Sequence, residues 1–359
     1  MSYQPPLDLP TEFRLALACC RWAFAGDSDE AVRRSAAEAD WVRFIETCRR
    51  HRVQGLVWNA LSGLKVDVPP PVRIALSGDA RTIAERGLRA ARESGRLAGA
   101  FELADVPLLF LKGLALAMLA YGKPFAKMSA DVDVLILPED IVRSATVLQE
   151  LGYRLQVPAT DSKLMRWHGL SKESVWRGEN GLVLELHHRV ADQPQLLRTL
   201  TASSPRQLVE IVPGIELPTF ADEETFAYLC VHGASSAWFR LKWITDFAAL
   251  LHARTPDEID MLYERSQELG AARAAGQALL LADRLYAIPL GETLGKRLRK
   301  SNVSRWLTRA ALDDLLSGEP TERPFGTRTI HLTQFFLMPG MRYKMEELGR
   351  QARVAAGVF

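Results

Sequence analysis

Two aspartates inside an apolar run constrain the fold of this chain more than any other feature. Residues 130–137 read ADVDVLIL, and Asp131 and Asp133 are the only polar side chains in the run. A short apolar run of this length suits a buried strand, on which side chains two apart point to the same face, roughly 6.5 to 7 Å from each other along the chain. Two ionised carboxylates beside a core are costly without a compensating cation. The run therefore predicts either a cation site or a strand end at which both aspartates are solvated or cap a turn.

The residues on both sides of this strand predict a small α/β unit. Residues 107–111, PLLFL, form a continuous apolar run that suits another buried strand, and residues 114–120 are typical of a helix. A further helix is expected to begin at Pro138 and to end at Gly152, because proline favours a first helical turn and glycine a helix end. Residues 153–157 predict a third strand.

Two hairpins are predicted further along the chain. Asn180-Gly181 stands between the β-prone runs 174–177 and 182–187, and Asn-Gly between such runs is a strong hairpin signal. A second hairpin is expected over 208–219, turning at Pro213-Gly214. We therefore expect an α/β fold of the α+β type, in which a small mixed sheet lies between helical flanks.

The expected organisation has three parts: an N-terminal helical region (1–105), an α/β core (106–195) and a mostly helical C-terminal region (196–359). Apolar residues at three- and four-residue spacing indicate amphipathic helices in both flanks. The sequence holds no internal repeat at a fixed period.

Composition excludes several classes of protein. Among 359 residues, 45 Lys and Arg stand against 43 Asp and Glu, a net charge of +2 that gives no electrostatic footprint for duplex DNA. No apolar run reaches the roughly 18 residues that a membrane span needs, and the first residues lack the pattern of a signal peptide. The four cysteines show no metal-ligand or redox spacing, which is typical of reduced thiols. A cytoplasmic protein that does not bind membranes is expected.

Glu185 is a third carboxylate inside an apolar strand, on the face opposite Leu184 and Leu186. Three carboxylates on two strands of one sheet are enough to ligate two Mg²⁺ ions, which at a spacing of about 3.5 to 4 Å clamp phosphate oxygens for an in-line displacement. The alternative is that Glu185 is a rim residue on the polar face of a hairpin.

Lys112-Gly113 follows an apolar strand and opens a helix. A glycine here lets the backbone approach a triphosphate closely, helix N-terminal N–H groups face the anion, and Lys112 can supply a positive charge. A plain strand-to-helix turn with a solvated lysine is the alternative.

These motifs together resemble an uncharacterised bacterial nucleotidyltransferase family of the polymerase-β-like superfamily. The resemblance rests on the run LLFLKGLALAMLAYGKPFAKMSADVDVLILPED, on the later LVLELHH, and on YLCVHGASSAWFRLKWITDFAALL, and it covers roughly residues 105–255. Two positions depart from the wider pattern. Leu114 stands where most superfamily members have a serine, and Lys127, with Ser129 nearby, stands where the family usually has an arginine, so the bidentate fork is lost.

The resemblance implies transfer of a nucleoside monophosphate from an NTP, most often ATP, with release of pyrophosphate. It implies that Asp131, Asp133 and Glu185 bind two Mg²⁺ ions, with Mn²⁺ as the alternative ion, and that Glu185 also orients or deprotonates the acceptor hydroxyl. It further implies that Lys112 and Gly113, with Lys127 and Ser129, bind the nucleotide. The acceptor is undefined: a peptide, a protein, a small molecule or tRNA.

Three further residues are candidates for supporting roles. His187 lies on the Glu185 face of its strand and can support the site or be a structural histidine. His232 and Asp246, on downstream helices, can close over the base or acceptor, or form a buried His–Asp hydrogen bond between packed helices. The absence of HExxH and paired CxxC motifs argues against zinc, and that of Walker A and GxGxxG motifs against P-loop and Rossmann enzymes.

Two rival functions remain open at this stage. One is an abortive-infection-type toxin, a nucleotidyltransferase that modifies tRNA or protein. The other is a non-catalytic nucleotide-binding or scaffold protein in which the altered phosphate turn no longer supports turnover.

Overall fold

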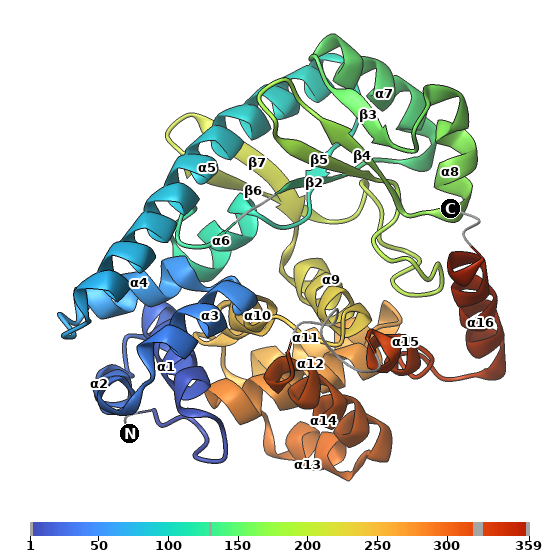
Figure 1. The fold of residues 1–359 in the computed structure, drawn as a ribbon. Coiled ribbons are helices and arrows are strands. Elements are labelled where there is room, and N and C mark those ends of the chain that lie inside the picture. Colours follow the sequence, from blue (N-terminus) through green and yellow to red (C-terminus); the bar gives the residue numbers. More distant parts are fainter. Residues whose placement is uncertain (1–2, 129–130, 319–325, 357–359) are drawn as a thin grey trace.

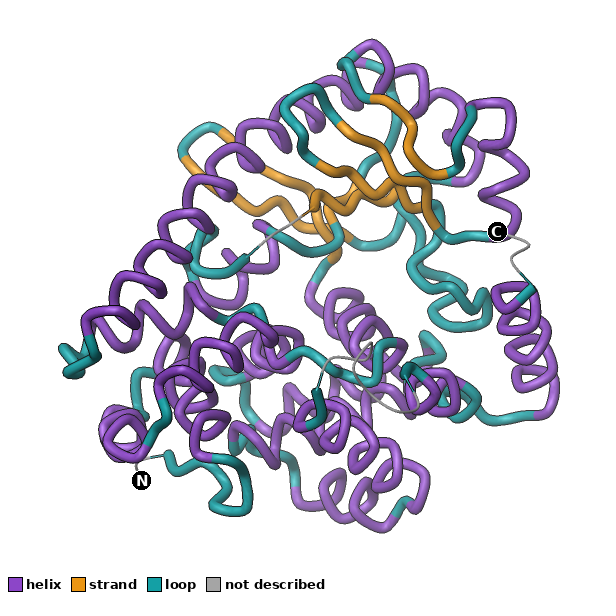
Figure 2. Tube along the Cα trace, in the orientation of Figure 1, coloured by secondary structure: helices purple, strands orange, loops and turns teal. Residues whose placement is uncertain are grey.

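A mixed sheet and a large helical body make up the protein. The computed structural model describes residues 3–128, 131–318 and 326–356. Figures 1 and 2 show the strands gathered in one half of the molecule and most of the helices packed together in the other. The long helix α5 runs along one side and connects the two halves (Figure 1).

The larger sheet has the strand order β1-β2-β5-β4-β3. Its central pair, β2 and β5, is parallel, whereas the other neighbours are antiparallel. This mixed sheet among helices confirms the expected α+β fold. The strands are β1 (Leu109–Phe110), β2 (Asp131–Leu135), β3 (Arg154–Val157), β4 (Glu173–Arg177) and β5 (Val183–His187).

Helices follow the strands much as the sequence predicts. Helix α6 begins directly after Gly113, and the helix expected from Pro138 to Gly152 is a short 3-10 turn followed by α7. The elements of this part are α5 (Pro70–Leu103), α6 (Leu114–Tyr121), the 3-10 turns η1 (Pro138–Asp140) and η2 (Asp161–Lys163), α7 (Ile141–Glu150) and α8 (Leu164–Leu170).

One hydrophobic core joins the sheet to the C-terminal half of α5. Leu97 and Phe101 of α5 are fully buried in the same cluster as Val134 and Leu184 of the central strands. A polar link reinforces this packing, because the hydroxyl of Tyr153 donates a hydrogen bond to Glu93 of α5 over 2.7 Å. The sheet is therefore anchored to a helix of 34 residues, about 51 Å long.

The second predicted hairpin is also present and lies beside the sheet. It consists of β6 (Arg206–Val212) and β7 (Ile215–Phe220), which pair antiparallel. The hydroxyl of Thr219 donates a hydrogen bond of 2.6 Å to the carbonyl of Phe110 in β1. This contact places the hairpin next to the strand that leads into Lys112 and Gly113.

The N-terminal and C-terminal helices share a second hydrophobic core. Leu17 and Phe44 from the start of the chain are buried in one cluster with Phe226, Phe247 and Leu281 from its second half. As a result α3 and α10 lie close together below the sheet (Figure 1). The N-terminal helices are α1 (Thr11–Ala25), α2 (Asp29–Glu38), α3 (Trp41–His51) and α4 (Gln54–Gly63). The C-terminal helices are α9 (Asp222–Ser235), α10 (Leu241–Leu251), α11 (Pro256–Glu268), α12 (Ala272–Tyr286), α13 (Glu292–Lys300), α14 (Asn302–Leu316), α15 (Arg328–Gln334) and α16 (Met341–Ala355).

Two expectations from composition can be compared with the fold. Across the described ranges, none of the helices has the length and apolar character to cross a membrane. All four cysteines are buried free thiols, as their spacing suggests.

Candidate active site

The central parallel pair of strands brings two predicted carboxylates face to face. In the register of β2 and β5, Asp133 lies opposite Glu185. Their neighbours Val134, Leu184 and Leu186 are fully buried in the core on the other side of the sheet. The alternation of a strand thus turns both carboxylates toward the helical half of the protein.

Asp133 is the most buried of the three predicted carboxylates and has two basic partners. The ammonium of Lys112 lies 2.9 Å from its Oδ1, and Nε2 of His187 lies 3.4 Å from the same oxygen. Burial alone would raise the pKa of this carboxyl, but Lys112 and then His187 overcome it and hold the pKa well below its usual range. Asp133 is therefore ionised, and its charge is compensated by the chain itself.

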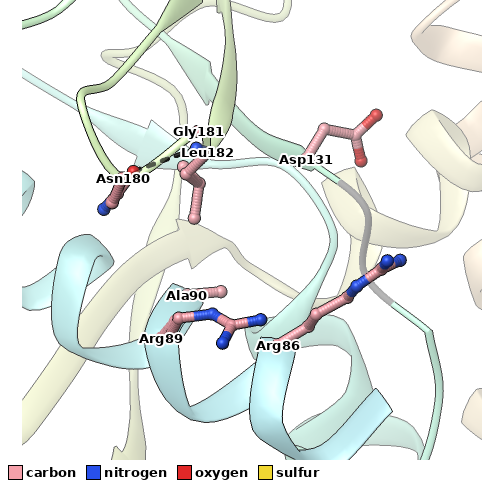
Figure 3. A pocket seen from close by; sticks show the side chains of 7 residues that line it. All are labelled: Arg86, Arg89, Ala90, Asp131, Asn180, Gly181 and Leu182. Atoms are coloured by element: carbon pink, nitrogen blue, oxygen red, sulfur yellow. Dashed lines mark hydrogen bonds between the residues drawn. The ribbon is translucent and has the colours of Figure 1, made fainter. Parts of the chain in front are cut away.

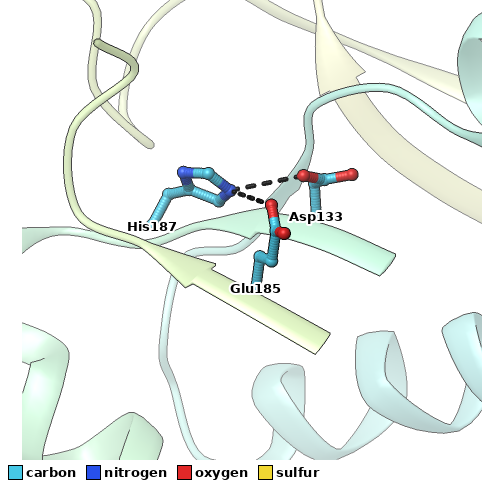
Figure 4. Close-up of side chains that lie close together, drawn as sticks. All are labelled: Asp133, Glu185 and His187. Carbon is cyan, nitrogen blue, oxygen red and sulfur yellow. Dashed lines mark hydrogen bonds and ion pairs between the residues drawn. The ribbon is translucent and has the colours of Figure 1, made fainter. Parts of the chain in front are cut away.

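Asp133, Glu185 and His187 form a compact cluster (Figure 4). Each offers one ligand atom, and these atoms lie within 4.8 Å of one another. Nε2 of His187 is 3.5 Å from Oε2 of Glu185. Burial raises the pKa of Glu185 to about 7, and hydrogen bonds to Asp133 and Glu185 raise that of His187 to about 9 against the opposing effect of burial.

Glu173 completes the surroundings of His187. In the β4–β5 register it lies opposite His187, and its Oε2 is 3.1 Å from Nδ1 of the ring. Glu173 is a site residue that was not predicted from the sequence. The predicted hairpin contained the necessary information. Counting outward from the Asn180-Gly181 turn pairs Glu173, at the start of one strand, with His187, at the end of the other.

Asp131 is the first residue of β2. It lies two residues before Asp133, so both side chains point to the same face of the strand. It is not part of the 4.8 Å cluster, but it lines the same cleft as Asp133. Burial, followed by repulsion from Asp133, raises the pKa of Asp131. Additional positive charge near Asp131 would therefore favour its ionised form.

The turn between β1 and α6 has the geometry that only glycine adopts readily. Gly113 has φ 68° and ψ −123° and is the residue before the first turn of α6. Lys112 and Gly113 lie beside Asp131 and Asp133 in the same cleft. The role in nucleotide binding that the sequence predicts for this dipeptide stays a prediction.

A cleft opens between Asp131 and Asp133 on one side and the helical half on the other, whereas Glu185 lies beside Asp133 and does not line it. The empty space of the cleft is ≈ 730 Å³, part of it open to solvent. The helical half contributes residues from the end of α3 and from α9 and α10. The lining residues are Arg52, Lys112, Gly113, Leu116, Lys127, Met128, Asp131, Asp133, Leu229, His232, Trp238, Lys242, Trp243 and Asp246.

Basic side chains dominate one side of this cleft. Lys127 is nearly buried, and its ammonium binds Oδ2 of Asp246 over 2.6 Å, while Tyr121 donates to the other oxygen over 2.8 Å. Burial, followed by repulsion from Lys127 and Arg52, lowers the pKa of Lys242 to about 8. A polyanion entering the cleft would relieve this repulsion.

Sequence reasoning missed Arg52 and Lys242. Lys242 stands in the segment FRLKWITD, next to residues that were chosen, so its charge was a usable signal. Arg52 follows α3, far outside the α/β core, and no local pattern connects it with the carboxylates.

Two roles were predicted as alternatives for His232 and Asp246: to close over the base or acceptor, or to form a buried His–Asp hydrogen bond. Both residues line the cleft. The hydrogen bonds recorded for Asp246 come from Lys127 and Tyr121, and Nε2 of His232 has no hydrogen-bond partner in the part of the chain that the structure describes. Ser129, predicted near the nucleotide, lies outside the described residues.

A second pocket adjoins the start of β2 (Figure 3). Arg86 and Arg89 of α5 line it together with Asn180, Gly181 and Leu182 of the hairpin turn and with Asp131. The carboxylate of Asp131 points away from Arg89 and Asn180 in this view. Asp131 therefore lies between two pockets.

The sequence matches a known protein family. A family model described as an uncharacterised nucleotidyltransferase matches residues 37–287. The chain belongs to this nucleotidyltransferase family. The match begins in the N-terminal helices and extends beyond the range 105–255 in both directions, so α3 and α12 are part of the family architecture. No curated protein matches the sequence.

A divalent ion fits the donors that this cluster of side chains presents. Ligands of an octahedral ion at about 2.1 Å are separated by about 3.0 to 4.2 Å, close to the spread of the Asp133, Glu185 and His187 atoms. Carboxylate oxygens suit Mg²⁺ and Mn²⁺, and an imidazole nitrogen suits transition-metal ions. The residues present can therefore hold a metal.

Proposed function

We propose that the protein transfers a nucleoside monophosphate, AMP from ATP in the first instance, to a hydroxyl-bearing acceptor and releases pyrophosphate. The observation that carries this proposal is the opposition of Asp133 and Glu185 on adjacent parallel strands, where Asp133 lines a cleft whose other side is basic. Membership of a nucleotidyltransferase family supports the reaction class. The cytoplasm, where NTPs are abundant, is the proposed location.

Asp131, Asp133 and Glu185 are proposed to hold two Mg²⁺ ions, with Mn²⁺ as the alternative. Bound metal would neutralise charge on the phosphate oxygens and stabilise the charge that develops during transfer. Burial, followed by repulsion from Asp133, raises the pKa of Asp131, and burial raises that of Glu185; a divalent ion would favour the charged form of both carboxylates.

The triphosphate is proposed to lie between the turn at Gly113 and the basic side of the cleft. Lys112 lies at the turn, and Lys242 and Arg52 face it from α10 and from the end of α3. Lys127, held by Asp246, would add positive potential, and Ser129 is retained as a nucleotide contact. No hydroxyl follows Gly113, so backbone N–H groups and lysines would carry the contacts that a serine makes elsewhere.

Glu185 is the proposed base. The acceptor oxygen attacks the α-phosphorus, the bond from that phosphorus to the α,β-bridging oxygen breaks, and pyrophosphate leaves. Glu185 takes the acceptor proton, for which its partly exposed carboxylate beside Asp133 is suitable.

Transfer can be tested with two labels. The protein is incubated with Mg²⁺ or Mn²⁺ and with ATP labelled at either the α- or the γ-phosphorus, in the presence of small molecules, tRNA or total protein from a bacterial lysate. The proposal predicts label transfer from α-labelled but not γ-labelled ATP, and its loss in Glu185→Gln.

The same experiment separates the rival functions. Label on tRNA or on many lysate proteins would indicate a toxin-type enzyme, whereas label on one small molecule or peptide would indicate biosynthesis. Nucleotide binding without label transfer in any fraction would contradict the proposed activity and favour a non-catalytic nucleotide-binding protein. Transfer from γ-labelled ATP would indicate a kinase.

A further inference from the structure

His187 occupies a more central position than a supporting residue requires. Its side chain is 3% exposed, and Nε2 points between the carboxylates of Asp133 and Glu185, 3.4 Å and 3.5 Å away (Figure 4). His187 also belongs, with Asp133 and Glu185, to the group whose ligand atoms lie within 4.8 Å of one another. The ring is therefore aimed at the point where a metal held by both carboxylates would lie.

The other ring nitrogen has a different environment. Nδ1 lies 3.1 Å from Oε2 of Glu173 in an ion-pair contact, and neither of these two atoms has a hydrogen-bond partner within the described ranges. Histidines that ligate a metal usually direct their second nitrogen toward a carboxylate or a carbonyl, which fixes the tautomer and the ring orientation. Glu173 is placed to do this, because strand pairing holds it opposite His187.

We infer that His187 is itself a metal ligand through Nε2, with Glu173 as its positioning residue, and that the site prefers a first-row transition-metal ion such as Mn²⁺ to Mg²⁺. This inference rests on the proposed function for the presence of a metal, but it adds a ligand and a selectivity. Sites with oxygen ligands alone suit Mg²⁺, whereas an imidazole nitrogen favours transition-metal ions.

A competing role for His187 makes the opposite predictions. As an imidazolium it would merely balance the charges of Asp133 and Glu185, as Lys112 does for Asp133. A cation that competes with the metal weakens metal binding, so its removal would strengthen binding. A ligand that is removed weakens binding.

The probe is Mn²⁺ alone, without nucleotide, observed by electron paramagnetic resonance. Free Mn²⁺ is titrated against wild-type protein, His187→Gln and the control His331→Gln, which changes an exposed histidine of α15. Pulsed spectra of the bound ion report nitrogen in the first coordination shell, and competition with Mg²⁺ gives the selectivity ratio. Circular dichroism establishes that each variant is folded.

The inference predicts nitrogen coupling in the wild type, its loss in His187→Gln, and a Mn²⁺ affinity that falls by at least tenfold in that variant alone. The Mn²⁺ to Mg²⁺ affinity ratio should fall with it. Glu173→Gln should keep the nitrogen coupling but weaken Mn²⁺ binding about 10- to 100-fold, and Glu173→Asp should restore part of the affinity. A residue that only supports the fold would not change the spectrum in this way.

Two results would overturn the inference: a wild-type Mn²⁺ complex without nitrogen coupling, or a His187→Gln variant that binds Mn²⁺ as tightly as wild type or more tightly. If His187→Gln does not fold, wild-type protein labelled with ¹⁵N-histidine decides the question, because only a bound imidazole changes the coupling pattern. These readouts need no nucleotide or acceptor. A protein that binds Mn²⁺ through His187 but transfers no label would thus contradict the proposed activity and leave this inference standing.

Discussion

The ammonium of Lys112 lies 2.9 Å from Oδ1 of Asp133, and the Asp133 side chain is only 1% exposed. Two aspartates in an apolar strand need a compensating cation, and here the strand-to-helix turn supplies one. The same lysine lies at the proposed triphosphate site. Lys112 therefore links the charge of the carboxylates to the charge of the nucleotide. Because Lys112 pairs with Asp133, replacing Asp133 by a neutral residue should change the stability of the protein differently from the same replacement of Asp131.

Asp133→Asn should destabilise the protein in EDTA at neutral pH, by about 3 kcal/mol, because it leaves the largely buried Lys112 without its partner. The folded-state pKa of Asp133 is lowered, so its contribution is present above the unfolded pKa near 3.8 and is lost as the pH falls. Urea unfolding at pH 7 measures the difference. Stability equal to wild type would show that the Lys112–Asp133 contact contributes nothing.

Asp131→Asn should behave in the opposite way. Burial and repulsion from Asp133 raise the pKa of Asp131, so its negative charge costs stability at neutral pH. We expect a melting temperature in EDTA equal to wild type or higher. A loss as large as that of Asp133→Asn would mean that the Asp131 carboxylate has a structural role. In both variants label transfer should fall by orders of magnitude.

Lys112→Ala should weaken NTP binding by at least tenfold, whereas Lys123→Ala should not change it. Both lysines flank α6, but only Lys112 lies at the turn beside the carboxylates, and Lys123 is exposed beyond the far end of the helix. Calorimetric titration with a non-hydrolysable ATP analogue gives the two dissociation constants. Equal affinities for the two variants would remove Lys112 from the nucleotide site.

Nucleotide affinity should decrease as the pH rises through about 8. Lys242 has a pKa lowered to about 8 by burial and by the repulsion of Lys127 and Arg52, so it loses its charge in this range, and an uncharged amine attracts a triphosphate less. Lys242→Arg keeps its charge at high pH and should abolish the decrease between pH 7.5 and 9. Binding curves with the same pH dependence in both proteins would exclude Lys242 as the titrating group.

Much of the sheet could be predicted from local sequence. The Asn180-Gly181 turn gave the β4–β5 hairpin, and the alternation of LVLELH placed Glu185 and His187 on one face. The apolar run around Asp131 and Asp133 predicted strand β2. These features depend on the two-residue period of a strand and on turn chemistry, which neighbours in sequence determine.

The pairing of β2 with β5 could not be predicted in the same way. The strands are separated by α7, β3, α8 and β4, and no local pattern fixes a parallel register that places Asp133 opposite Glu185. The basic side of the cleft is a second feature that local sequence does not predict. Arg52 reaches it only because the N-terminal and C-terminal helices share one core, which is a property of the whole chain.

The most direct test of the proposed site is a crystal structure of the protein with Mn²⁺ and an ATP analogue that cannot be cleaved between the α- and β-phosphates. Anomalous scattering locates Mn²⁺ without reference to the protein. The account predicts Mn²⁺ bound by Asp133 and Glu185, with Asp131 on the same or a second ion, and the β- and γ-phosphates between Gly113 and Lys242. Mn²⁺ bound away from these carboxylates, or a triphosphate outside the cleft, would contradict it.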